Sequence, residues 1–204
     1  MRPTLLSTTM LLAGLATGLS STAAAQGAVA AKPVHAQAHR AGDSPPSDAA
    51  LIANALSAAP ASIAAGATVK GHDGRVLRQG TNDWVCLPDM PNLPNDSPMC
   101  LDAPWRALID AWMNKRTPHV TQVGFAYMLQ GDMPVSNTDP FATAPTPTNQ
   151  WIQHGDPHVM VFIPDLQLLE GMSTDPTSGG PYVMWKGTPY AHIMLPGTVP
   201  PKHQ

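Results

Sequence analysis

Two segments near the carboxyl end of the chain carry the side chains with the clearest chemistry. Each has a histidine followed two residues later by a methionine, as His158 with Met160 and His192 with Met194. Residues two apart on a β-strand lie on the same face, so each imidazole is expected beside a thioether. If the two strands are neighbours, two nitrogen and two sulfur ligands converge, and such a soft set suits copper, particularly Cu(I). The pattern therefore predicts a copper site at these four residues.

The same residues admit other interpretations. Methionine fills irregular gaps in protein cores, and a histidine at a strand end commonly bonds a backbone group. Three hypotheses follow: a binding module for a metal or small molecule, an exported enzyme that uses His158 or His192 with a nearby Asp, and an envelope structural or interaction protein without a small ligand. The enzyme predicts an open cleft and a perturbed histidine pKa, whereas the structural protein predicts that both histidines are buried and hydrogen-bonded.

A second group of polar side chains lies close to the first histidine pair. His154 precedes His158 by four residues, a spacing that two zinc ligands of a protease share on a helix. Residues 155–157 contain glycine and proline, which exclude a helix, and no glutamate follows His154, so a zinc protease is excluded. His154 and Asp156 are expected on a loop, where Asp156 can orient an imidazole. With Tyr182 they form the predicted ligand-binding set.

The last third of the chain repeats a short turn phrase of glycine, any residue, proline and a ring. Glycine adopts the unusual dihedral angles of a turn, and proline keeps the residue before it out of the helical region, so each phrase leads into a strand. A helix with Asp165 as its N-cap is expected at 165–172. The phrases occupy 155–158, 179–182 and 187–190, and the strands that they help to predict are 158–163, 182–185 and 191–195.

Upstream segments complete the predicted fold. Ser47 and Asp102 are expected as N-caps of two helices, and the second helix ends before Pro118. The Asp-Gly pair at 73–74 predicts a hairpin turn. Strands at 63–70, 75–79 and 83–87 are expected to form an antiparallel meander, with another strand at 120–129 and a long loop without assigned structure at 131–148. One apolar stripe of the second helix holds Trp105, Leu108, Ile109, Trp112 and Met113.

Composition agrees with this arrangement. The chain has 23 prolines and 16 glycines, and charged residues make up only 12 % of it, which indicates a fold rich in loops. The predicted class is α+β, a largely antiparallel sheet with a few short helices packed on one face. The formal net charge of −3 argues against nucleic acid as a partner, because a nucleic-acid-binding protein needs a basic face.

The amino-terminal residues indicate export. Arg2 precedes an apolar run at 5–19, and alanines at 23–25 offer a small-residue cleavage site, so residues 1–25 are predicted to be a signal peptide. The run is shorter than the roughly 20 residues that span a bilayer, so no membrane insertion is expected after cleavage. Residues 26–46 are predicted to be a disordered polar tether, and 47–200 a single domain.

The cysteines are consistent with that destination. Cys86 and Cys100 are the two cysteines of the chain, and an oxidising compartment is expected to join them in a disulfide. The protein is therefore expected in the periplasm or outside the cell.

Four phrases of the chain resemble a family of small exported bacterial proteins carried in genomes as hypothetical. The resemblance covers roughly residues 55 to 196. It implies export from a bacterium and transfers no activity, cofactor or site residue. The phrases are Trp84-Val85-Cys86-Leu87-Pro88-Asp89, Pro98-Met99-Cys100-Leu101-Asp102, Pro157-His158-Val159-Met160 and Tyr182-Val183-Met184-Trp185.

Overall fold

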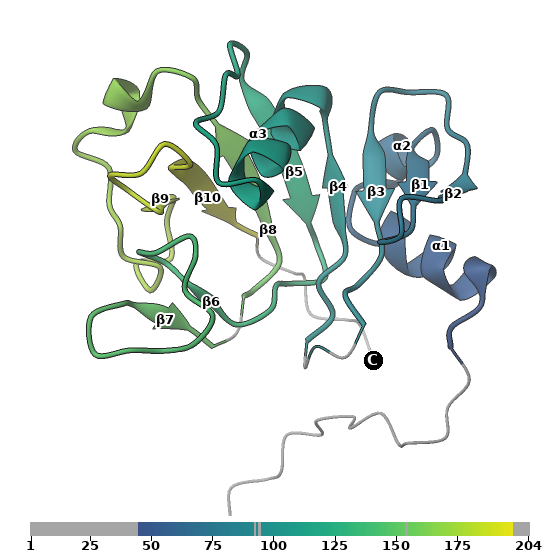
Figure 1. The fold of residues 1–204 in the computed structure, drawn as a ribbon, viewed down its shortest axis with the longest axis horizontal. Helices are drawn as coiled ribbons and strands as arrows, with labels where there is room; N and C mark the ends of the chain where they lie inside the picture. The colour runs from purple at the N-terminus through teal and green to yellow at the C-terminus, as the bar shows by residue number, and fades with distance from the viewer. Residues whose placement is uncertain (1–44, 92, 94, 154, 198–204) are drawn as a thin grey trace, which may run out of the picture. The chain divides into compact units, whose positions relative to one another are not determined.

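A computed structural model describes residues 45–197 except 92, 94 and 154. The predicted signal peptide at 1–25, nearly all of the predicted tether at 26–46, and His154 lie outside the described residues. The helices and strands of the described part, labelled in Figure 1 except for η1, are α1 (Asp48–Leu56), α2 (Ala61–Ala64), β1 (Thr68–Lys70), β2 (Val76–Arg78), β3 (Val85–Leu87), β4 (Met99–Leu101), α3 (Ala103–Met113), β5 (Gly124–Met128), β6 (Val135–Ser136), β7 (Trp151–Ile152), β8 (His158–Phe162), the 3₁₀ helix η1 (Leu166–Leu169), β9 (Tyr182–Met184) and β10 (His192–Pro196).

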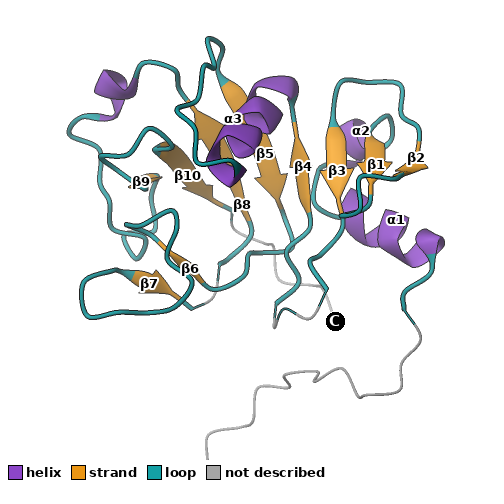
Figure 2. Cartoon of the chain, in the orientation of Figure 1, coloured by secondary structure: helices purple, strands orange, loops and turns teal. Residues whose placement is uncertain are grey.

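A single large sheet organises the domain. Its eight strands follow the order β2-β1-β3-β4-β5-β8-β10-β9, and β6 with β7 forms a separate two-stranded sheet. Every neighbouring pair in the large sheet is antiparallel except β1 with β3. Figure 2 shows the strands with the few short helices around them. The predicted α+β class with a largely antiparallel sheet is confirmed.

The predicted antiparallel meander at 63–70, 75–79 and 83–87 is wrong in two respects. Residues 61–64 are helical, and β3 pairs with the side of β1 that β2 leaves free, running parallel to β1. The Asp-Gly hairpin between β1 and β2 does form, with Gly74 at a φ of 81°. Beyond β2, however, the backbone N–H groups of Thr81 and Asn82 donate to the Gly66 carbonyl at 2.7 and 3.0 Å. The chain therefore crosses the beginning of β1 before β3 starts.

The helices divide between the two faces of the sheet, so the prediction that they all pack on one face is wrong. Consecutive strand residues point to opposite faces, and β4 shows the division: Cys100 packs with Ala55 of α1, whereas Leu101 packs with Trp105 of α3. The face under α3 is called the pocket face below. Cys86 and Cys100 are opposite one another in the β3–β4 register and form the predicted disulfide, with a Cα–Cα distance of 4.0 Å.

Helix starts agree with the local signals. The Ser47 hydroxyl accepts a hydrogen bond from the Ala50 N–H at 3.3 Å, and the Asp102 carboxylate accepts one from the Trp105 N–H at 2.8 Å. The Asp165 carboxylate accepts from the Gln167 N–H, so the predicted cap is confirmed, but the expected helix at 165–172 is only the 3₁₀ turn η1. None of the helices in the described residues is long and apolar enough to span a membrane.

The segment at 131–148 is more ordered than expected, because it contains β6. The Asn137 amide donates to the Gln150 side chain at 2.6 Å and to the Thr174 carbonyl at 2.8 Å. Its partners lie far along the chain, so local sequence signals could not reveal them. The segment is held against the pocket face, where it forms one wall of the site described next.

Candidate functional site

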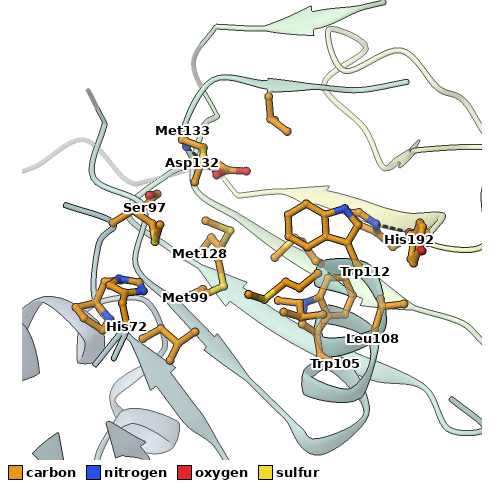
Figure 3. A pocket seen from close by; sticks show the side chains of 18 of the residues that line it. His72, Ser97, Met99, Trp105, Leu108, Trp112, Met128, Asp132, Met133 and His192 are labelled. Carbon is orange, nitrogen blue, oxygen red and sulfur yellow. Dashed lines mark hydrogen bonds between the residues drawn. The ribbon is translucent and has the colours of Figure 1, made fainter. Parts of the chain in front are cut away.

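An open pocket of about 550 Å³ lies on the pocket face, beside α3. Its walls come from α3, from the strands of the large sheet, and from the residues around β6. Figure 3 shows His72 and Ser97 on one side of it and Trp112 and His192 on another. The lining is almost wholly apolar, and it includes seven methionines and three tryptophans: Met90, Met99, Met113, Met128, Met133, Met160, Met184, Trp105, Trp112 and Trp185.

The amphipathic pattern of α3 explains part of this lining. Trp105 and Leu108 are buried on the stripe that the sequence predicts, whereas Met113 at the end of the stripe is 71 % exposed. One turn along, Trp112 stacks on Trp185 with ring centroids 5.4 Å apart. The two flat indoles form an apolar side wall that a planar molecule can stack against.

His192 supplies one of the few polar atoms in the pocket. Its Nδ1–H donates to the Tyr190 carbonyl at 2.9 Å, and burial lowers the pKa of His192 to about 4. The ring is therefore neutral at pH 7, with its lone pair on Nε2. Within the described residues, His192 Nε2 and the indole Nε1 of Trp105 are buried without hydrogen-bond partners, and the two rings lie edge to face at 5.2 Å. Both atoms are enclosed behind the surface of the pocket lining.

Asp132 lines both the large pocket and a second cavity of about 70 Å³. One carboxylate oxygen accepts from the Met133 N–H at 2.7 Å. Burial raises the pKa of Asp132, and the neighbouring His158 opposes this rise. Asp132 is a residue of the site that the sequence patterns do not predict. Its only local signal is a glycine before it at the start of a polar loop, and many turns share that feature.

The small cavity brings together several residues that the sequence predicts for a site. His158, Asp156 and Tyr182 all line it, and His154 lies outside the described residues. The His158 Nδ1–H donates to the Asp156 carbonyl at 2.6 Å, which leaves the lone pair of the neutral ring on Nε2. That atom is buried and has no partner in the described part of the chain. Burial, with the charges of Asp132 and Asp156, raises the pKa of Tyr182 to about 12.

The four residues of the predicted copper set lie on neighbouring strands and share the pocket face, but they do not surround one point. Met160 is directly opposite Met194 in the β8–β10 register. His158 is opposite Pro196, four residues from His192, or about 14 Å along the strand direction. Both histidines precede their methionines in sequence, so antiparallel pairing of the methionines places the histidines at opposite ends. His192 faces the large pocket and His158 the small cavity.

Carboxylates and thiols do not complete a metal site. Among the described residues, no group of three or more His, Cys, Asp or Glu side chains is placed to hold a metal ion. Any metal bound at this face would therefore depend on methionine sulfur.

Comparison with protein-family models, with curated proteins and with solved structures finds no match for the chain. The fold and the site define the class by themselves: an α+β protein with a disulfide-linked sheet and an apolar pocket on one face of that sheet.

Proposed function

We propose that the protein is a binding module for a small, largely apolar molecule held in the large pocket. The observation that carries the proposal is the pocket itself, whose volume of about 550 Å³ falls within the range of known ligand sites. Apolar surface removed from water on binding supplies the free energy. The stacked faces of Trp112 and Trp185 favour a ligand that contains a planar ring.

The unpaired polar atoms suggest how such a ligand is oriented. His192 Nε2 accepts a hydrogen bond, and Trp105 Nε1 donates one. A ring system that carries a hydroxyl or amide group pairs with both atoms if the side chains that cover them move aside. An analogue without that group leaves the two atoms unpaired, as they are in the described structure, and is expected to bind more weakly.

Export to the periplasm or out of the cell belongs to this proposal. The Cys86–Cys100 disulfide supports it, because such bonds persist in oxidising compartments. The predicted signal peptide at 1–25 supports it independently, from the sequence alone.

The two alternatives receive less support. An enzyme that uses His158 or His192 needs a carboxylate to orient the imidazole, but the Nδ1 atoms of both rings bond backbone carbonyls instead. A pKa near 4 also makes His192 a weak base at pH 7. If the protein were structural and bound no ligand, both histidines should be buried and hydrogen-bonded. The Nδ1 atom of each ring meets this expectation. A structural role does not explain why both Nε2 atoms are left unpaired beside cavities.

The proposal can be tested with the fluorescent probe N-phenyl-1-naphthylamine, which is apolar and planar. We expect saturable binding of one equivalent by the wild-type protein. Val135→Trp places an indole in the pocket lining and is expected to weaken the binding about tenfold or more. Val76→Trp is the matched control, because Val76 is 45 % exposed on β2 and does not line the pocket.

Circular dichroism and thermal unfolding establish that both variants fold. Equal binding by the folded Val135→Trp and Val76→Trp variants would contradict the proposal. So would the absence of saturable probe binding by the folded wild-type protein.

A further inference from the structure

Four buried side chains lie on three neighbouring strands and share the pocket face, and they are here called the methionine–histidine patch: Met128, His158, Met160 and Met194. Met128 is directly opposite His158 in the β5–β8 register, and Met194 is directly opposite Met160 in the β8–β10 register. Directly opposed side chains on one face have Cβ atoms about 5 Å apart. His158 and Met160 are two residues apart on β8 and share the same face.

The patch is shielded from water. The exposed fractions are 1 % for Met128, 3 % for His158, 7 % for Met160 and 3 % for Met194. The three thioethers and the imidazole are therefore almost completely covered by other protein atoms. The patch differs from an ordinary apolar core because it contains a polar atom, the Nε2 nitrogen of His158.

His158 Nε2 is the atom that points to a ligand. It is buried without a hydrogen-bond partner among the described residues, and the residue lines the small cavity of about 70 Å³. The hydrogen bond from its Nδ1–H to the Asp156 carbonyl fixes the ring so that the Nε2 lone pair is free. Metal-binding histidines are held in this way, with the second nitrogen donating to a carbonyl or carboxylate.

We propose that the methionine–histidine patch binds a single Cu(I) ion through His158 Nε2 and thioether sulfurs of the patch. Thioether sulfur and imidazole nitrogen form the soft ligand set that Cu(I) prefers. This set differs from the one predicted from sequence, because the sheet register replaces His192 with Met128. The ion and the apolar ligand are bound by different groups, although Met128 and Met160 also line the large pocket.

The surroundings of the patch are suited to a monovalent cation. Met128 and Met160 line the large pocket, His158 and Met194 line the small cavity, and Asp132 lines both, so the ion would lie in the wall between them. Asp132 contributes a carboxyl group to the walls of both cavities. Methionine side chains have three rotatable bonds, so their sulfurs can turn toward the ion with little change in the backbone.

The first test replaces sulfur and keeps volume. The triple variant Met128→Leu, Met160→Leu and Met194→Leu removes the patch thioethers, and leucine fills nearly the same space. The matched control carries the same three changes at positions that line the large pocket but not the small cavity: Met90→Leu, Met99→Leu and Met133→Leu. Cu(I) is added without oxygen to the folded wild-type and variant proteins in competition with bicinchoninate.

We expect one equivalent of Cu(I) on the wild-type and the control protein, and about 100-fold weaker binding by the patch variant. Equal loss in both triple variants would show that methionines bind Cu(I) anywhere in the pocket and would overturn the proposal. Unchanged binding by the patch variant, or no binding by the wild-type protein, would overturn it as well.

A second measurement follows the ring nitrogen directly, with Ag(I) as a surrogate that does not change oxidation state. The ¹⁵N resonance of His158 Nε2 is expected to shift on addition of one equivalent, and that of His192 Nε2 is expected to stay unchanged. A shift at His192 alone would overturn the assignment. Binding of N-phenyl-1-naphthylamine is measured on the same samples, so failure of the metal site and failure of the apolar pocket are told apart.

Discussion

Trp112 of α3 and Trp185, just beyond β9, stack with ring centroids 5.4 Å apart and an angle of 26° between their planes. Each indole N–H donates to a carbonyl of the segment around β6, Trp112 to Pro140 at 2.9 Å and Trp185 to Ser136 at 2.8 Å. The stacked pair therefore joins a helix, a strand end and a proline-rich segment around the pocket.

Replacing either indole with phenylalanine should loosen this junction. Trp185→Phe and Trp112→Phe keep a stacked ring but remove the N–H donor, which leaves the Ser136 or Pro140 carbonyl unpaired. We expect each change to lower the free energy of unfolding by about 1–2 kcal/mol, measured by urea denaturation. Phenylalanine variants as stable as the wild-type protein would show that water satisfies these carbonyls equally well.

Removing the disulfide should be costly, because it joins β3 to β4 across a proline-rich connection. Cys86 and Cys100 are 14 residues apart, and closing a loop of that size stabilises a protein by roughly 3 kcal/mol in the chain-entropy model. Cys86→Ala with Cys100→Ala should lower the free energy of unfolding by about that amount in urea denaturation. A loss below about 1 kcal/mol would mean that the reduced chain keeps the segment ordered when unfolded.

Stability should depend on pH through His192. Its pKa is about 4 in the folded protein, against the ordinary histidine pKa of 6.5 in the unfolded chain. Between these values the unfolded chain binds a proton that the folded protein does not, so this contribution is present above pH 6.5 and is lost as the pH falls toward 4. This difference between the two pKa values of His192 corresponds to about 3 kcal/mol in the free energy of unfolding.

The measurement is urea denaturation at pH 7 and at pH 4.5, for the wild-type protein and for His192→Gln. We expect the wild-type protein to lose markedly more stability on acidification than the variant, because glutamine does not titrate. Parallel loss in both proteins would assign the pH dependence to other groups.

Asp102 should contribute to stability through two hydrogen bonds. Its carboxylate accepts from the Trp105 N–H at 2.8 Å, which caps α3, and from the Phe125 N–H at 2.7 Å, which joins the helix start to β5. Asp102→Ala should cost about 2 kcal/mol in thermal or urea unfolding, and Asp102→Asn clearly less, because asparagine also caps helices. Asp110→Ala, at an exposed carboxylate on the same helix, is the control.

The three strands predicted near the carboxyl end of the chain are confirmed. Strands 158–163, 182–185 and 191–195 lie within a residue or two of β8, β9 and β10, because turn residues and alternating apolar side chains are local features. The order of β1, β2 and β3 was predicted incorrectly, because it depends on hydrogen bonds from Thr81 and Asn82 to Gly66, and no local signal reports these.

The sequence by itself determined the α+β class, the helix caps, the cysteine pair and the sharing of one face by each histidine and its methionine. These follow from spacing and from local backbone preferences. Only the tertiary structure decided that His192 faces the large pocket while His158 lies beside Met128 and Asp132. The reason is that strand order, direction and register join residues far apart in the chain, and antiparallel pairing sends the two histidines to opposite ends of one methionine pair.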